Sequence, residues 1–147
     1  MKKGEKLIGT GVIPLVIKKV KMEQAKRLAG PAPLCELLPY RLKKAGVITT
    51  GNEVYSGRIA DAFTPVVEKK LAQYGMRMEA HVTLGDGKQE IAEAIRRMKA
   101  EGCELILATG GMSVDPDDQT PGAIRESGAE IVSYGAPVLP GAMFCLA

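Results

Sequence analysis

Three carboxylates fall within four residues at one point of the chain, at Asp115, Asp117 and Asp118. They follow the pair Gly110–Gly111 and precede Thr120–Pro121. Thr is typical of a helix N-cap, and Pro is typical of the first turn that follows it. Two like charges about 4 Å apart repel by about 4 kcal/mol at an effective dielectric constant near 20. A bound Mg²⁺ would relieve this repulsion, because it takes carboxylate oxygens together with substrate phosphates. The pattern predicts a metal-assisted phosphate site, with helix capping or solvated side chains as the alternative.

Two apolar runs end in Thr followed by Gly, at Thr50–Gly51 and at Thr109–Gly110. Glycine has no β carbon, so the backbone at such a position can approach a phosphate closely and adopt positive φ. In a parallel sheet, the loops that leave the carboxyl ends of the strands form the ligand crevice. We therefore expect both loops to border one phosphate-binding site, although the same residues also suit simple turns.

The elements that would position these loops alternate between strands and helices. Runs of apolar or alternating residues predict strands at 45–50, 76–83, 105–109 and 130–133. Helical spacing predicts a helix from about residue 61 to 74, a second one capped by Asp86, and a short one from Thr120 to about Ser127. This order predicts an α/β fold with a mostly parallel sheet and helices packed on it.

The first 43 residues have a different character. They contain a short helical pattern at 22–28 and then an irregular stretch with Pro31, Pro33 and Pro39. Residues 1–44 carry eleven Lys or Arg against three Asp or Glu, which suits a solvated face or, alternatively, a nucleic-acid or membrane contact. We expect residues 1–43 to be a linker or the tail of a preceding domain, and 44–147 to be one domain, truncated at its C-terminal end.

Composition excludes several classes of function. Of 147 residues only 4% are aromatic and none is Trp, which argues against a protein that binds single-stranded nucleic acid or RNA by base stacking. His81 is the single histidine and is expected to be a packing or surface residue, so Ser113 has no evident base. Cys35, Cys103 and Cys145 suit reduced thiols of a cytoplasmic protein, and no apolar run reaches the roughly 18 residues of a membrane span. The P-loop motif is absent.

Two ordered motifs resemble the molybdopterin-binding domain family, which includes molybdopterin adenylyltransferases, molybdopterin molybdotransferases and competence-damage-inducible proteins. The first motif runs from Thr50 through Gly57 to Asp61, and the second from Thr109 through Asp118 to Pro121. The resemblance extends from about Lys43 to the end of the chain. It implies a three-layer α/β/α sandwich and a role in molybdenum cofactor biosynthesis or handling.

The resemblance also implies ligands and residue roles. Asp86 and Asp118 would be catalytic and would hold Mg²⁺ during nucleotidyl or molybdate transfer, with ATP as a further cofactor. The ligand would be the pterin phosphate molybdopterin, and a homodimer or homotrimer is implied. Where relatives often carry Pro-Asp-Asp this chain has Gly85–Asp86–Gly87, so a non-catalytic sensor or carrier is an alternative. An unrelated phosphate-binding α/β domain, in which the Gly-Gly and Asp-Asp segments are only turns, is a further alternative. The implied cofactor-binding residues are Thr50, Gly51, Asn52, Glu53, Gly57, Asp61, Thr109, Gly110, Gly111, Met112, Ser113, Asp117, Thr120 and Pro121.

Overall fold

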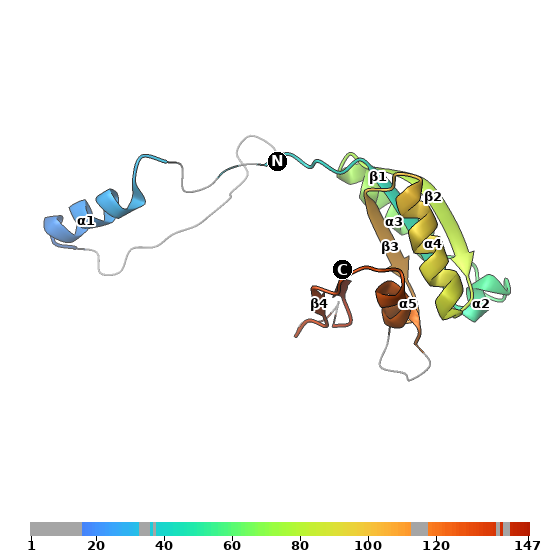
Figure 1. Ribbon diagram of the computed structural model, residues 1–147. Coiled ribbons are helices and arrows are strands. Elements are labelled where there is room, and N and C mark those ends of the chain that lie inside the picture. The colour runs from blue at the N-terminus through green and yellow to red at the C-terminus, as the bar shows by residue number, and fades with distance from the viewer. Residues whose placement is uncertain (1–15, 33–35, 37, 113–117, 138, 140–141) are drawn as a thin grey trace. The chain divides into compact units, whose positions relative to one another are not determined.

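The computed structural model describes residues 16–32, 36, 38–112, 118–137, 139 and 142–147. The chain divides into two compact units, Met1–Pro39 and Tyr40–Ala147. The described part of the first unit contains helix α1 (Lys19–Ala29), which buries none of its residues (Figure 1). All further elements belong to the second unit. The role of residues 1–43 as a linker or domain tail stays a prediction.

The second unit is built on a parallel sheet of three strands, β1 (Lys44–Thr50), β2 (Arg77–Leu84) and β3 (Leu105–Thr109). The spatial order is β2-β1-β3, so the first strand lies at the centre. Residues 45–50 of β1 are all buried, as expected for an apolar strand that is covered on both faces. The predicted parallel sheet is confirmed.

Helices cover both faces of this sheet (Figure 1). Helix α3 (Phe63–Gln73) packs Leu71 against Ala45 and Val47 of the central strand. Helix α4 (Lys88–Ala100) packs on the opposite face, where Met98 contacts Ile48. Helix α5 (Thr120–Glu126) lies against α4, and the short α2 (Asn52–Tyr55) follows β1 directly. The three-layer α/β/α arrangement is therefore as predicted.

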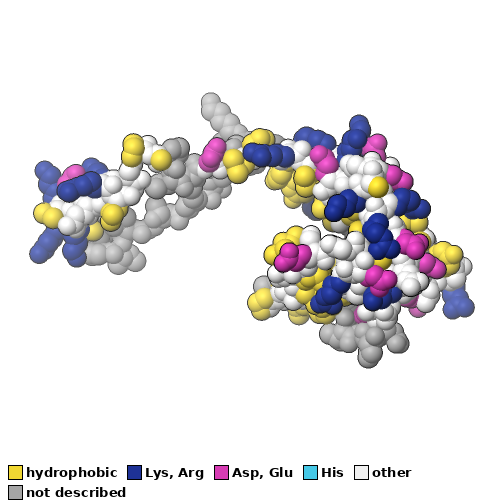
Figure 2. Space-filling model, in the orientation of Figure 1, with side chains coloured by type: hydrophobic (Ala, Val, Ile, Leu, Met, Phe, Trp, Pro, Cys, Tyr) yellow, Lys and Arg dark blue, Asp and Glu magenta, His cyan; other side chains and the backbone are white. Residues whose placement is uncertain are grey.

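Gly46 allows α4 to approach the sheet closely. A β carbon at this position would lie 2.6 Å from the sulfur of Met98 and 3.3 Å from that of Cys103. The outer side of α4 carries Lys, Arg and Glu side chains, of both signs, as Figure 2 shows. The helix thus has one apolar face against the sheet and one charged face toward solvent.

A bulge in β2 changes which face its side chains occupy. Ala45 pairs with Met78 and Gly46 with Ala80, so Glu79 is an extra residue. Beyond it, Ala80 packs on the α4 face, whereas His81 pairs with Val47 and lies on the α3 face. Such bulges redirect the side chains that follow them.

Three expectations were wrong in detail. Residues 130–133 do not add a strand to the parallel sheet. Instead, β4 (Ser133–Tyr134) pairs antiparallel with β5 (Cys145–Leu146) in a separate small sheet. Asp86 does not cap α4, because Gly87 is the N-cap residue and has no side chain to do so. Thr120 is the first helical residue of α5 rather than its N-cap, and its hydroxyl bonds elsewhere.

None of the helices in the described ranges is both long and apolar enough to cross a membrane.

Candidate functional site

The carboxyl ends of the three parallel strands meet at one edge of the sheet. Thr50 is in register with Leu84 of β2, and Thr49 is in register with Thr109 of β3. The backbone amide of Gly51 donates a hydrogen bond of 3.1 Å to the carbonyl oxygen of Leu84. The loops that follow β1, β2 and β3 therefore leave the sheet from neighbouring positions, where α/β proteins bind their ligands.

The glycine pair after β3 is enclosed by its neighbours. Gly110 has φ +92°, and a β carbon there would lie 2.3 Å from the carbonyl oxygen of Thr50. Gly111 has φ +56°, and its β carbon would lie 2.6 Å from Oγ1 of Thr120. Both the backbone conformation and the space around it therefore require glycine at these two positions.

Threonine hydroxyls hold this turn in place. Oγ1 of Thr50 donates to the carbonyl oxygen of Thr109 at 3.1 Å, and Oγ1 of Thr120 donates to that of Gly110 at 3.1 Å. The amide of Thr120 also donates to the carbonyl oxygen of Gly111 at 3.3 Å. Oγ1 of Thr109 differs, since it is buried and has no hydrogen-bond partner among the described residues. A buried hydroxyl without a hydrogen-bond partner lowers the stability of the fold unless another group forms a hydrogen bond with it.

The loop after β1 turns tightly over the sheet edge. The carbonyl oxygen of Glu53 accepts hydrogen bonds from the amides of Arg58 at 2.9 Å and Ile59 at 3.2 Å, and Gly57 has φ +72°. Asn52 reaches the neighbouring loop after β2, because its Oδ1 would lie 2.9 Å from a β carbon on Gly85. The structure thus brings the predicted residues of the first loop next to the segment that carries Asp86.

The two acids expected to hold a metal lie in different loops. Asp86 follows β2 and Asp118 precedes α5, and both are half-buried. Since β1 separates β2 from β3, these loops leave strands about 10 Å apart, twice the usual strand spacing. Within the described ranges, no three His, Cys, Asp or Glu side chains are grouped as metal ligands. Ser113, Asp115 and Asp117 lie outside the described residues, so the three-carboxylate hypothesis stays a prediction.

Asp61 caps the following helix. Its Oδ1 accepts hydrogen bonds from the amides of Phe63 at 2.9 Å and Thr64 at 3.0 Å, and its Oδ2 accepts from the hydroxyls of Thr64 and Thr49. These bonds, that of the Thr64 hydroxyl above all, lower the pKa of the Asp61 carboxyl below its ordinary value. The described contacts give Asp61 a role in orienting α3 at the base of the first loop.

His81 joins this group, which the sequence did not reveal. Its Nε2 lies 3.0 Å from Oγ1 of Thr64, 3.2 Å from Oγ1 of Thr49 and 3.7 Å from Oδ2 of Asp61. The same ring nitrogen faces the hydroxyls and the carboxylate, and Thr49 is only 1% exposed. This differs from a nucleophile-activating histidine, which faces the hydroxyl with one ring nitrogen and the carboxylate with the other. We call Thr49, Asp61, Thr64 and His81 the polar cluster.

The remaining predicted cofactor-binding residues also border this edge. Thr120 and Pro121 are buried at the start of α5, and Met112 is half-buried after the glycine pair.

The chain matches a known family of cofactor-binding domains. The family described as "Probable molybdopterin binding domain" matches residues 46–144. A "CinA-like protein" of Mycobacterium sp. (strain JLS) is 36% identical over 91 residues, which cover 60% of this chain and 21% of that protein. The chain therefore spans about a fifth of the length of the curated relatives it matches.

Solved structures share the fold. The molybdopterin biosynthesis enzyme MoaB from Thermus thermophilus superposes with a TM-score of 0.55 and 28% identity, over 58% of this chain and 54% of that one. The protein CinA from Thermoplasma acidophilum, whose function is described as unknown, gives a TM-score of 0.56 and 27% identity, over 61% and 53% of the two chains.

Proposed function

We propose, from the premise that this chain belongs to the probable molybdopterin binding domain family, that it binds the phosphate end of molybdopterin at the carboxyl edge of β1 and β3. Membership in the family supports a role in molybdenum cofactor biosynthesis or handling. The solved neighbour from Thermus thermophilus is named as an enzyme of molybdopterin biosynthesis, which agrees with a pterin ligand.

The turn Thr109–Gly110–Gly111 carries this proposal. Its two glycines expose backbone with no β carbon, which lets a phosphate approach the chain closely. The buried Oγ1 of Thr109 lacks a partner among the described residues and can donate to a phosphate oxygen. A buried hydroxyl without a hydrogen-bond partner, next to two glycines, is better explained by an anionic ligand than by a simple turn.

The residues of the first loop would contact the rest of the ligand. Thr50, Gly51, Asn52 and Glu53 lie at the same sheet edge, and Gly57 closes the loop. Asn52 presents an amide group that can both donate and accept hydrogen bonds, as a pterin ring requires. We assign Asp61 to the support of this loop, because its described contacts are to Thr49, Phe63, Thr64 and His81.

Mg²⁺ and nucleotidyl or molybdate transfer form the finer part of the proposal. Asp86 and Asp118 would hold Mg²⁺, since carboxylate oxygens are its preferred protein ligands. When bound, the ion would stabilise the charge on the reacting phosphates, including those of ATP. Non-catalytic handling of the cofactor is the second candidate, and it is favoured by the single acid in Gly85–Asp86–Gly87.

Titration with molybdopterin, followed by its fluorescence, tests the binding proposal. We expect saturable binding that weakens in Thr109→Val, with Thr83→Val on β2, at the far side of the central strand, as the matched control. Absence of saturable binding would overturn the proposal. Incubation with ATP and Mg²⁺ then separates the two candidates. Adenylylated product that is lost in Asp86→Asn and Asp118→Asn supports transfer, and binding without product supports handling.

A further inference from the structure

Tyr55 is an exposed aromatic residue at the sheet edge to which the ligand is assigned. It is the last residue of α2, the short helix that follows β1, and it is 65% exposed. Its backbone is held in place, because its amide donates a hydrogen bond of 2.9 Å to the carbonyl oxygen of Gly51. The chain has four Tyr and two Phe, and Tyr55 is the one that falls in the segments joining β1, β2 and β3 to α3, α4 and α5.

The ring of Tyr55 and the amide group of Asn52 lie against the same neighbour. The two residues are three positions apart on α2, so their side chains project from one side of the helix. A β carbon on Gly85 would lie 2.9 Å from Oδ1 of Asn52 and 3.9 Å from Cδ1 of Tyr55. Gly85 is buried, and Asp86 follows it directly. Both side chains of α2 are therefore positioned where the first loop meets the loop after β2.

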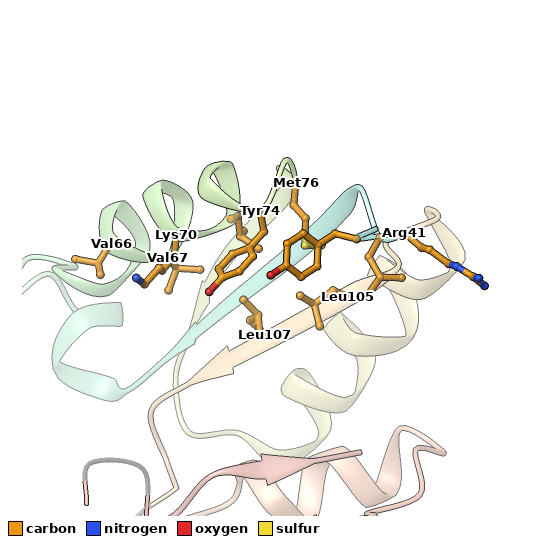
Figure 3. A pocket seen from close by; sticks show the side chains of 11 residues that line it. Arg41, Val66, Val67, Lys70, Tyr74, Met76, Leu105 and Leu107 are labelled. Carbon is orange, nitrogen blue, oxygen red and sulfur yellow. The ribbon is translucent and has the colours of Figure 1, made fainter. Parts of the chain in front are cut away.

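Tyr40 is equally exposed but has an aromatic partner. It is also 65% exposed, and its ring meets that of Tyr74 edge to face with centroids 5.1 Å apart. Both tyrosines line an apolar pocket between α3 and β3, which Figure 3 shows. Tyr55 belongs to no such ring pair among the described residues, so its ring has room to pack against a flat ligand.

Molybdopterin carries two groups that need different partners. Its terminal phosphate suits the glycine turn after β3, whereas its pterin is a flat, fused heterocycle with a polar edge. Aromatic side chains bind flat heterocycles by stacking, and side-chain amides bind their polar edges. Because β1 separates β2 from β3, about 10 Å lies between the turn after β3 and the loop after β2. A ligand with its phosphate at that turn would extend across the end of β1 toward α2.

We propose that Tyr55 stacks on the pterin ring of molybdopterin, while the amide of Asn52 binds the polar edge of the ring. This inference rests on the proposed function, since it concerns the same ligand at the same site. It makes Tyr55 the residue that distinguishes a pterin phosphate from a phosphate that has no ring. The turn at Thr109 would then bind the phosphate, and α2 would bind the pterin.

Two ligands, one with the ring and one without it, test the proposal on the full chain. Isothermal titration calorimetry measures the Kd of molybdopterin and of inorganic phosphate for the wild type and for Tyr55→Ala, Tyr55→Phe and Thr109→Val. Tyr40→Ala is the matched control, because Tyr40 has the same exposure and precedes β1, at the opposite end of that strand. Phe63→Ala tests the aromatic residue that begins α3. Circular dichroism confirms that each variant is folded.

We expect Tyr55→Ala to raise the Kd of molybdopterin about five- to tenfold, through the loss of one stacking contact, and to leave that of phosphate unchanged. Tyr55→Phe keeps the ring and should bind molybdopterin nearly as well as the wild type. Thr109→Val should weaken the binding of both ligands. Tyr40→Ala and Phe63→Ala should weaken the binding of neither.

The outcomes separate this inference from the proposed function. If the wild type binds no molybdopterin, the proposed function fails and the inference fails with it. If the wild type binds molybdopterin and Thr109→Val weakens that binding, an unchanged Kd in Tyr55→Ala overturns the inference alone. Equal losses in Tyr55→Ala and Tyr55→Phe, or an equal loss in Phe63→Ala or Tyr40→Ala, also overturn it. A parallel loss of phosphate binding in Tyr55→Ala would do so too, because it would mean that the substitution disturbs the turn after β3.

Discussion

The carbonyl oxygen of Thr50 lies 2.3 Å from the point at which a β carbon on Gly110 would stand. The end of β1 therefore rests directly against the turn that follows β3. We predict that Gly110→Ala destabilises the protein in two ways. A positive φ costs a residue with a β carbon about 1–2 kcal/mol, and forcing the two backbones apart costs a further 1–3 kcal/mol, about the size of an overpacked core.

Gly128→Ala separates these two costs. Gly128 has φ +93°, almost the same as Gly110, but nothing lies within 4 Å of its would-be β carbon. Urea unfolding should show a larger loss of free energy of unfolding for Gly110→Ala than for Gly128→Ala. Equal losses would mean that the contact between Thr50 and position 110 relaxes without cost.

Thr109→Val should change stability and ligand binding in opposite directions. Oγ1 of Thr109 is buried without a partner in the described part of the chain, so a methyl group in its place removes a desolvation penalty of about 1–3 kcal/mol. We expect the free energy of unfolding to stay the same or rise. Affinity for molybdopterin should fall if this hydroxyl serves the ligand.

Thr120→Val is the contrasting variant for this prediction. Thr120 is 1% exposed, and its hydroxyl donates to the carbonyl oxygen of Gly110. Its loss leaves a buried acceptor without that donor, so this variant should lower the free energy of unfolding by about 1 kcal/mol. Thermal melts of both variants decide the matter, and similar destabilisation by the two would contradict the distinction between their hydroxyls.

Asp61→Ala should lower stability in a pH-dependent way. The amide bonds to Phe63 and Thr64 cap α3, and loss of such a cap costs about 0.5–2 kcal/mol. The pKa of Asp61 is lowered from its ordinary value of 3.8 in the folded state, chiefly by the Thr64 hydroxyl. The folded protein therefore binds this proton less readily than the unfolded chain does, so the charged form stabilises the fold above that value.

The stabilisation by Asp61 is lost as the pH falls through the lowered pKa. Urea unfolding at neutral pH should therefore show the full difference between wild type and Asp61→Ala, and the difference should shrink in acid below the ordinary value of 3.8. Glu68→Ala, an exposed carboxylate on the same helix, controls for the loss of an acid from α3. A difference that is constant with pH would rule out the charged form as its source.

Local sequence patterns predicted the strands and helices whose buried side chains must be apolar. The apolar run at 105–109 and the helical spacing of Ile91, Ala94 and Met98 correspond to β3 and to the buried face of α4. The spacing of apolar residues indicates which side chains are buried, because buried positions recur with the period of the helix or strand that carries them. The Thr-Gly pairs likewise mark two strand ends that the sheet brings together.

Contacts between distant segments could not be predicted in this way. The bulge at Glu79 places His81 on the α3 face, and no local pattern fixes that register. The sequence at 130–133 predicts a strand of the parallel sheet, but β4 begins at Ser133 and its partner is β5, near the end of the chain. Asp86 is of a residue type that is favoured at helix N-caps, yet Gly87 is the N-cap residue of α4. The sequence motifs pointed to Asp61 but not to the other members of the polar cluster, Thr49, Thr64 and His81.

Cys103 and Cys145 should react with iodoacetamide at very different rates in the folded protein. Cys103 is 8% exposed and packs with Ile48 and Met98, and burial, aided by the Glu101 and Glu79 carboxylates, raises the pKa of its thiol. Because the thiolate is the nucleophile, both effects slow its alkylation at mildly basic pH. Cys145 lies half-buried in β5 and is accessible. Peptide mapping by mass spectrometry should find Cys145 modified first and Cys103 only after denaturant is added. Rapid labelling of Cys103 without denaturant would mean that α4 opens from the sheet in the native state, since Met98 covers this thiol.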